Sequence, residues 1–261
     1  MFEKEEIEYQ KILKQYNESI VSKMDAEALS LRSEVMFSAH SCGIEGNSYS
    51  VDDSFALKEL ELGYVPKNKP LVETMEMLDH FHAYEYMVST KDEPLTEEYI
   101  KHLHFLLTEH TITYRHPDTL PGEYTNTDMG AGDTIFGDHT VLIKRVPDLL
   151  RSTNKAIEKN SVPPMFISAI FHGYFIYLHP FRDGNGRLGR LLSNKILLQA
   201  GLPPIIIKRE EKDEYIRCLK LFKKDSTDYL VGYFYKTAIS QMKEELQQKT
   251  QNNKIEGFSF L

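Results

Sequence analysis

Apolar residues recur along most of the chain at the three- and four-residue spacing of one helix face. The stretch 7–31 shows the pattern well, with apolar side chains at Ile7, Ile12, Leu13, Tyr16, Ile20, Val21, Met24, Leu29 and Leu31. Further helices are expected over 33–45, 50–63, 70–88, 96–109, 146–159, 163–178, 187–200, 209–223 and 226–248. Because 163–178 is apolar on nearly every side, we expect it to form a buried central helix.

One segment, 111–146, breaks this helical pattern. It is rich in Gly, Asp and Thr, and its stretch "TVLIK" (140–144) is expected to form one strand of a small hairpin, within a flap over about 130–144. No repeat and no linker divides the chain. The sequence therefore predicts an all-α (mostly α) fold: a single domain over 1–261, built as a helical bundle with a small β-hairpin flap and a tail at 249–261.

Composition narrows the class of protein. Hydrophobic residues make up 41% of the chain and charged residues 27%, as in an ordinary soluble domain. The net charge of −8 argues against nucleic-acid and membrane partners, since phosphate-rich surfaces attract basic proteins. No apolar run is long enough to span a membrane, the N-terminus does not resemble a signal peptide, and Cys42 and Cys218 form no CxxC pair. These features predict a cytoplasmic protein.

The stretch "HPFRDGNGRLGRLL" (179–192) concentrates candidate chemistry on this acidic chain. The residues Gly184–Gly186 precede a helix, where unpaired backbone N–H groups and the helix dipole favour an anion. Arg187 and Arg190 add cationic side chains on nearly one helix face. Backbone amides with two arginines suit a di- or triphosphate better than a single phosphate.

The backbone N–H groups of 184–186 and the two arginines form an expected phosphate cradle. Two further side chains lie beside this cradle in the sequence. Asp183 offers a lone carboxylate next to the expected phosphates, which is how proteins commonly hold Mg²⁺. His179 can act as a base near neutral pH. A base, a metal ligand and a triphosphate cradle together predict attack of an external hydroxyl on a nucleotide phosphate. The residues alone do not say which phosphorus is attacked.

Two other interpretations fail on context. "GNGRLG" (184–189) matches the GxGxxG of dinucleotide-binding folds, but no strand leads into it and too little chain follows to complete a parallel sheet. The pairs His80/His82 and His102/His104 suggest zinc, but side chains two residues apart do not share a helix face, and no Cys or acid cluster completes a site. Neither a dinucleotide nor a zinc ion is therefore expected.

"HPFRDGNGRLGR" agrees at every defined position with HPFx(D/E)GNGRxxR, the motif of the Fic family, which the chain resembles over about 30–240. "AIFHGYFIYL", "LTEEYIKHLHFLL" and "LPGEY" are also similar to Fic segments. The resemblance implies the Fic fold, with its core over about 95–240. It also implies a protein adenylyltransferase, an enzyme that uses ATP and Mg²⁺ to transfer AMP to a Tyr, Thr or Ser hydroxyl of a target protein, the chain itself included.

The resemblance also implies a role for each motif residue. His179 would deprotonate the target hydroxyl, and Asp183 would bind Mg²⁺. Pro180 and Phe181 would hold the loop, with Phe181 anchored in the core. The residues that would bind the nucleotide are Gly184, Asn185 and Gly186 as the anion hole, Arg187 at the phosphates, Arg190 at the γ-phosphate and Tyr215 near the adenine.

A second Fic motif, (S/T)xxxE(G/N), is matched by "SCGIEGN" (41–47) at Ser41, Glu45 and Gly46. Its place within the N-terminal helices, 1–50, is similar to that in one regulatory class of the family. The resemblance implies that Glu45 pairs with Arg190 and prevents productive ATP binding. Some relatives use this glutamate to position a water molecule and remove AMP, so de-AMPylation stays open as the alternative.

Several points stay open at this stage. Thr125 follows "PGEY", where many relatives carry Arg, which leaves the choice of target undetermined. The target hydroxyl, the donor nucleotide and the signal that releases Glu45 are also undetermined. So is the oligomeric state, a homodimer included.

Overall fold

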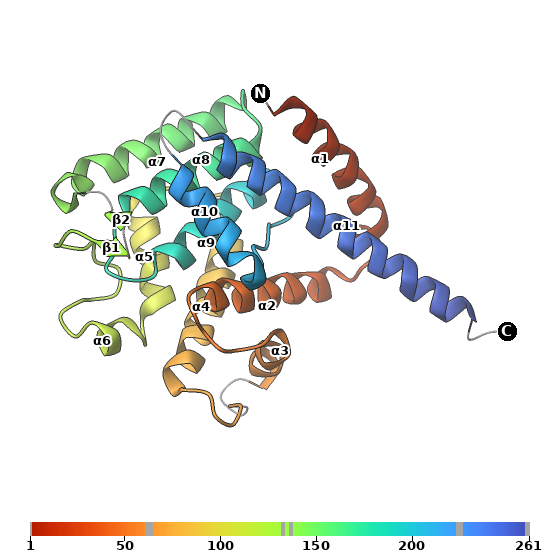
Figure 1. The fold of residues 1–261 in the computed structure, drawn as a ribbon, viewed down its shortest axis with the longest axis horizontal. Helices are drawn as coiled ribbons and strands as arrows, with labels where there is room; N and C mark the ends of the chain where they lie inside the picture. Colours follow the sequence, from red (N-terminus) through yellow and green to blue (C-terminus); the bar gives the residue numbers. More distant parts are fainter. Residues whose placement is uncertain (1, 61–64, 132–133, 136–137, 223–226, 259–261) are drawn as a thin grey trace.

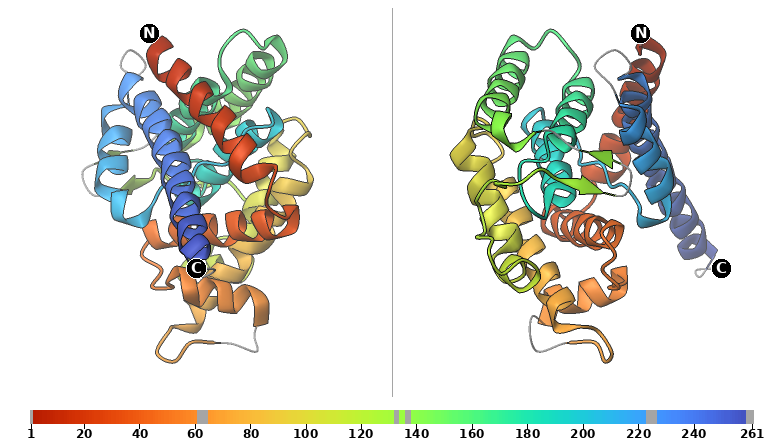
Figure 2. Two further views of the ribbon diagram at one scale, coloured as in Figure 1. Left: turned by 90° about the vertical axis from the view of Figure 1, so that its right-hand side faces the viewer. Right: turned by 60° about the vertical axis from the view of Figure 1, so that its left-hand side comes forward.

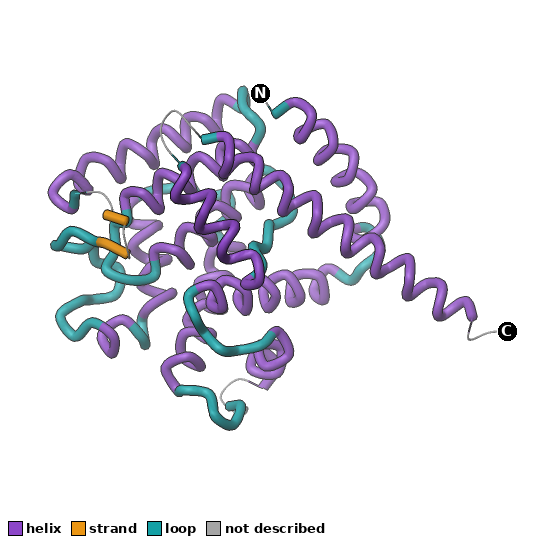
Figure 3. Tube along the Cα trace, viewed as in Figure 1, coloured by secondary structure: helices purple, strands orange, loops and turns teal. Residues whose placement is uncertain are grey.

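The computed structural model describes residues 2–60, 65–131, 134–135, 138–222 and 227–258, which are mostly helical (Figures 1 and 3). The first helices are α1 (Glu3–Tyr16), the π-helix η1 (Asn17–Val21), α2 (Ala26–Ile44), α3 (Val51–Leu60), α4 (Leu71–Ser89), α5 (Glu97–Thr108) and α6 (Ile112–Arg115). After them come the 3₁₀ turn η3 (His139–Val141), α7 (Leu142–Lys159), α8 (Pro164–Leu178), α9 (Asn185–Gln199), the 3₁₀ turn η4 (Arg209–Glu211), α10 (Lys212–Leu221) and α11 (Asp228–Phe258). The predicted mostly α fold is confirmed. No described helix combines the length and apolarity that a membrane crossing requires.

Helices α8 and α9 form an antiparallel pair at the centre of the molecule, joined by the loop 179–184 (Figure 1). On α8, Phe171 and Phe175 are buried because the helix is apolar on several sides. On α9, Leu188 and Leu191 face the same apolar core. The prediction of a buried central helix is confirmed, and α4, α5 and α7 pack around this pair.

The first and last helices lie side by side although they are far apart in the sequence. Figures 1 and 2 show α1 running along α11, and the two helices are in contact. Tyr9 and Leu13 of α1 share one apolar cluster with Leu230 and Phe234 of α11. This cluster also contains Met165 of α8, and α11 is in direct contact with α8.

The expected helix over 7–31 is interrupted between η1 and α2. Asp25 caps α2, because its carboxylate accepts a hydrogen bond from the Ala28 N–H (2.9 Å). The apolar spacing continues across residues 22–25, so periodicity alone does not reveal the break. Helix α2 thus begins at Ala26 and ends at Ile44, and Glu45 is its C-cap residue.

The last helix is longer than expected. It does not end at residue 248 but continues to Phe258, since no proline or glycine interrupts 249–256. The described part of the expected tail is therefore helical. Its last residues, 259–261, lie outside the described residues.

The flap contains a short antiparallel hairpin of β1 (Gly130–Ala131) and β2 (Thr134–Ile135), in which Gly130 pairs with Ile135 and Ala131 with Thr134. The segments 132–133 and 136–137 of the expected flap lie outside the described residues. The predicted strand at 140–144 is wrong. Asp138 caps the turn η3 by accepting from the Thr140 N–H (2.8 Å), and α7 begins directly after it.

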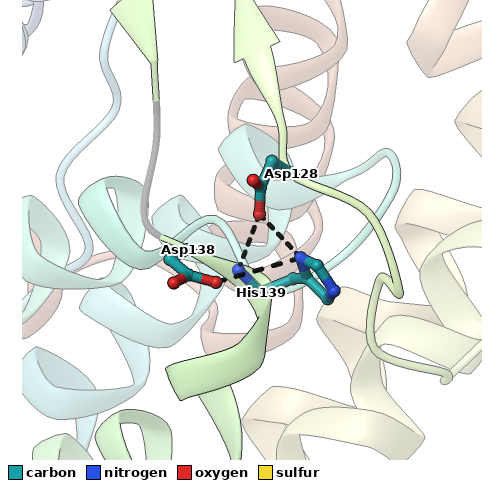
Figure 4. A group of neighbouring side chains, drawn as sticks. All are labelled: Asp128, Asp138 and His139. Carbon is teal, nitrogen blue, oxygen red and sulfur yellow. Dashed lines mark hydrogen bonds and ion pairs between the residues drawn. The ribbon is translucent and has the colours of Figure 1, made fainter.

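A polar cluster closes the base of this flap (Figure 4). Asp128 accepts hydrogen bonds from the backbone N–H of His139 (3.1 Å) and from its Nδ1 (2.6 Å). Asp138 lies 3.9 Å from the same ring nitrogen. The hydrogen bonds from His139 lower the pKa of Asp128 below its ordinary value. These contacts join the segment before β1 to the turn after β2.

Candidate active site

The loop between α8 and α9 presents the motif at one end of the central pair. His179 ends α8 in a left-handed backbone conformation (φ 49°), which turns the chain sharply out of the helix. Phe181 is fully buried and stacks on His104, with ring centroids 3.8 Å apart. The Thr125 N–H donates to the Pro180 carbonyl (2.8 Å). The loop is therefore fixed between the core and the segment that leads to the flap.

Asn185 closes this loop with its side chain. Its amide oxygen accepts from the Phe181 N–H (3.0 Å), and its amide nitrogen donates to the Phe181 carbonyl (2.7 Å). The Asn185 residue is only 2% exposed. What Asn185 offers to an anion is therefore its backbone N–H in the first turn of α9, where helices leave N–H groups unpaired.

His104 of α5 supports the site, and sequence reasoning missed it. Its Nδ1 accepts from the Gly122 N–H (2.9 Å), so its Nε2 carries the proton and donates to the Asp183 carbonyl (3.0 Å). Burial lowers the pKa of His104 to about 4, which keeps the ring neutral. In the sequence only its spacing from His102 is visible, and that spacing suggests a metal rather than a backbone contact.

The side chain of His179 is held neutral. Burial lowers its pKa to about 4, although the Ile176 carbonyl, Glu45 and Asp183 each act to raise it. Its Nδ1 lies 3.3 Å from the Ile176 carbonyl, which can only accept, so Nδ1 carries the proton and Nε2 is the basic nitrogen. At neutral pH this ring can take up a proton.

The cradle at the start of α9 contains the Glu45 carboxylate. A Cβ atom on Gly186 would clash with Glu45 Oε1 and lie 3.2 Å from Arg190 Nη1, so a side chain at this position would displace the carboxylate. Glu45 reaches this point from the end of α2, where Gly46 (φ 104°) turns the chain away. Its oxygen therefore stands at the helix end whose dipole favours an anion.

Arg190 pairs with this carboxylate. Its Nη2 lies 2.8 Å from Glu45 Oε1 and 2.8 Å from the Ser41 carbonyl, and its Nε donates to Ser41 Oγ (3.0 Å). Arg190 is 3% exposed, whereas the Glu45 side chain is 38% exposed. Burial acts to raise the pKa of Glu45, but the guanidiniums of Arg190 and Arg187 outweigh it and lower this pKa, so the carboxylate is ionised. The structure thus brings Ser41, Glu45 and Arg190 together, whereas an inhibitory role of Glu45 stays a prediction.

Tyr215 of α10 lies against Arg190 and is 1% exposed. Its ring centroid is 5.9 Å from the guanidinium carbon, and its hydroxyl is 2.7 Å from His172 Nε2. Because Ser193 Oγ donates to the Gly189 carbonyl, His172 Nδ1 donates to Ser193 and His172 Nε2 accepts from Tyr215. Tyr215 thereby supports Arg190, and its predicted position near the adenine stays a prediction.

Arg187 belongs to a partly buried cluster of four charges. It is 1% exposed, its Nη1 pairs with Glu76 Oε1, and its Nη2 lies 3.3 Å from Asp183 Oδ1. Arg115 Nη1 lies 2.9 Å from Glu76 Oε1 and 3.2 Å from Asp183 Oδ2. Both terminal nitrogens of Arg187 thus face carboxylates, and its predicted contact with phosphates stays a prediction. Sequence reasoning missed Glu76 and Arg115, since neither lies in a motif.

The Asp183 carboxylate has the charge that a divalent cation needs. Burial would raise its pKa, but the Arg187 guanidinium, the Gly184 N–H and the Arg115 guanidinium together lower it to about 2. Each of its oxygens already faces a cationic side chain, Arg187 at Oδ1 and Arg115 at Oδ2. A single carboxylate that leaves the remaining positions to phosphate and water suits Mg²⁺.

Comparison with known sequences identifies related proteins. A family model described as the Fic/DOC family matches residues 94–197. The protein adenylyltransferase Fic of Drosophila grimshawi is 31% identical over 186 residues, which cover 70% of this chain and 36% of that protein. The protein of the same name from Nematostella vectensis is 33% identical over 186 residues, covering 69% of this chain and 41% of that protein. The chain thus spans less than half the length of these relatives.

A solved structure shows the same fold. The crystal structure of a Fic domain containing signaling protein from Bacteroides thetaiotaomicron matches with a TM-score of 0.78 at 23% identity, covering 90% of this chain and 95% of that chain. The matched family region, 94–197, contains the whole motif 179–190 and helices α5 and α6, which carry His104 and Arg115. The family expected from that motif is therefore confirmed, and this chain is a Fic-domain protein of the Fic/DOC family.

Proposed function

We propose that this protein is an autoinhibited protein adenylyltransferase, which transfers AMP from Mg-ATP to a Tyr, Thr or Ser hydroxyl of a target protein. The name and the similarity of the Drosophila and Nematostella relatives support the reaction class. The single observation that carries the proposal of autoinhibition is the Glu45 carboxylate, which stands against Gly186 in the anion cradle and pairs with Arg190.

The proposed transfer needs a base beside the cradle, and His179 has the required protonation state. The target hydroxyl oxygen forms a bond to the α-phosphorus of ATP while the bond from that phosphorus to the bridging oxygen breaks. Pyrophosphate leaves with that bridging oxygen, and His179 Nε2 takes the hydroxyl proton. Because the pKa of His179 is lowered to about 4, the ring is deprotonated before the target arrives.

The phosphates would be held by the first turn of α9. Gly184, Asn185 and Gly186 offer backbone N–H groups there, and Gly186 leaves room for a phosphate oxygen because it has no Cβ. Asp183 would hold Mg²⁺, which supplies positive charge that offsets the charge developing on the phosphates. Arg190 is oriented by Ser41 and Tyr215, so it stays in place when Glu45 is removed.

The proposed inhibition follows from charge and space. A γ-phosphate directed at Arg190 would meet the Glu45 carboxylate, another anion, at the same guanidinium. Two anions cannot share this buried cation without strong repulsion. ATP therefore binds in a productive pose only when Glu45 moves away. The 38% exposure of the Glu45 side chain leaves it a path to do so.

Labelling with ATP tests the proposal. Glu45→Gly should raise incorporation of labelled AMP into the protein itself or a target at least about tenfold, since it frees Arg190. The double variant Glu45→Gly with His179→Ala should incorporate none. Glu27→Gly is the matched control, because it removes an exposed glutamate from the other end of α2. Its labelling should equal that of the unsubstituted protein, called the parent below. Absence of labelling in Glu45→Gly would contradict the proposal, and mass spectrometry after incubation with each nucleoside triphosphate identifies a different donor.

De-AMPylation is the second candidate, because the same carboxylate is ionised and partly exposed to water. In that reaction Glu45 would orient a water molecule toward the AMP-modified hydroxyl. The test is the release of AMP from a modified target protein. Release that requires an intact Glu45, together with no labelling by Glu45→Gly, would favour removal of AMP over its addition.

A further inference from the structure

Arg115 stands at the carboxylate that the proposed function assigns to Mg²⁺. Its Nη1 lies 3.2 Å from Asp183 Oδ2, whereas Arg187 and the Gly184 N–H contact the other oxygen, Oδ1. Arg115 is 30% exposed, and Arg187 is 1% exposed. Of these two cations, only Arg115 has room to leave Asp183.

The backbone that carries Arg115 is tied to α4 on the same side. The backbone N–H of His110 donates to Asp79 Oδ2 (3.1 Å), and its ring Nδ1 lies 2.6 Å from Asp79 Oδ1. Asp79 is buried, so this contact fixes the turn between α5 and α6. Arg115 follows this turn on α6, and its guanidinium has Glu76 as a second partner at 2.9 Å.

We propose that Arg115 is the resident counterion of Asp183 in the nucleotide-free protein and yields Oδ2 to the divalent cation. This inference rests on the proposed function in that Asp183 is the metal ligand. A divalent ion and a guanidinium at one carboxylate oxygen repel each other in a partly buried site, so binding of the ion favours the arrangement in which Arg115 has moved away. The guanidinium moves onto Glu76, whose Oε1 already contacts it. Arg115 thus lowers the affinity of the empty site for metal and is a positioning residue for Asp183.

The test measures metal binding without nucleotide, by titrating Mn²⁺ and following free Mn²⁺ by electron paramagnetic resonance. Arg115→Gln should tighten Mn²⁺ binding about fivefold, the effect of losing one partly exposed charge pair. Arg115→Lys keeps the charge but replaces the forked guanidinium with a single ammonium, so its Mn²⁺ affinity should lie between those of Arg115→Gln and the unsubstituted protein. Asp183→Asn should abolish the same binding event.

Arg182→Gln is the matched control, because it removes an equal charge from an exposed arginine next to Asp183 that contacts Thr127 instead. It should change Mn²⁺ affinity less than twofold. An unchanged or weaker Mn²⁺ affinity in Arg115→Gln, with the fold intact by circular dichroism, overturns the inference. If Arg115→Gln does not fold, the test rests on Arg115→Lys. The inference is then overturned if Arg115→Lys binds Mn²⁺ as tightly as the unsubstituted protein does.

A second measurement separates this inference from the proposed function. Calorimetry compares Glu45→Gly with the double variant that also carries Arg115→Gln. The affinity of each protein for a non-reacting ATP analogue is measured at several Mg²⁺ concentrations. We expect the half-saturating Mg²⁺ concentration to fall about fivefold, with affinity at saturating Mg²⁺ unchanged. A loss of affinity at saturating Mg²⁺ would mean that Arg115 binds phosphates and would overturn the inference. Failure of Glu45→Gly to bind the analogue contradicts the proposed function, while the Mn²⁺ titration still decides the role of Arg115.

Discussion

Two arginines of the same helix, Arg187 and Arg190, differ in how exposed their carboxylate partners are. Arg187 pairs with Glu76 and Asp183, and both Arg187 and Glu76 are almost fully buried. Arg190 is also buried, but its carboxylate partner, Glu45, is 38% exposed and comes from 145 residues away. A buried pair is difficult to separate, whereas a pair with one exposed partner can open. The first arginine therefore belongs to the framework of the site, and we propose that the second can be switched.

The difference in burial predicts a large loss of stability at Glu76. Glu76→Gln leaves Arg187 without its buried partner, so the free energy of unfolding should fall by about 3 kcal/mol. Thermal denaturation should show a melting temperature lower by about 8 °C. Glu85→Gln, on the same helix but 55% exposed, is the control and should change the melting temperature by no more than about 2 °C. Equal losses in the two variants would remove the distinction between a framework pair and a surface pair.

Removing the carboxylate partner of the other arginine, Arg190, should lower the free energy of unfolding far less. Glu45→Gln removes a partner that is 38% exposed, and Arg190 keeps both contacts with Ser41. We expect the free energy of unfolding to fall by about 0.5 kcal/mol, measured by urea denaturation. A loss comparable to that of Glu76→Gln would show that Glu45 is part of the framework and cannot act as a switch.

The smallest expected effect concerns pH. Burial lowers the pKa of His179 to about 4, so the base form is lost only as the pH falls through that value. Glu45 acts to raise this pKa, so its removal cannot shift the acid limb upward. Single-turnover labelling by Glu45→Gly at saturating Mg²⁺ should therefore be nearly constant from about pH 6 to pH 8. A rate that halves near the ordinary histidine pKa would show that His179 is not held neutral.

The sequence predicts well those parts of the site whose residues are contiguous in the chain. The cradle, its base and its carboxylate lie within "HPFRDGNGRLGR", so one loop and one helix end bring them together. Glu45 was found because a second short motif includes it. By contrast, Glu76, Arg115 and His104 lie on three other helices and meet the motif only through tertiary packing. No spacing rule connects them to Asp183, and a buried ion pair leaves no periodic signal.

Two errors in the expected fold have a local cause. The apolar period over 7–31 continues across a break that the Asp25 cap creates, and strand propensity at 140–144 is overridden by the Asp138 cap. Both errors arise where one polar side chain decides the backbone path. The sequence does predict the central pair of helices, because many apolar residues of α8 indicate the same buried helix.

We propose above all that Glu45 keeps nucleotide out of the anion cradle. Calorimetric titration of a non-reacting ATP analogue with Mg²⁺ into the parent, Glu45→Gly and the control Glu27→Gly tests it directly. We predict that Glu45→Gly binds at least about tenfold more tightly than the parent, and that Glu27→Gly binds like the parent. Equal affinity in the parent and Glu45→Gly would contradict the account.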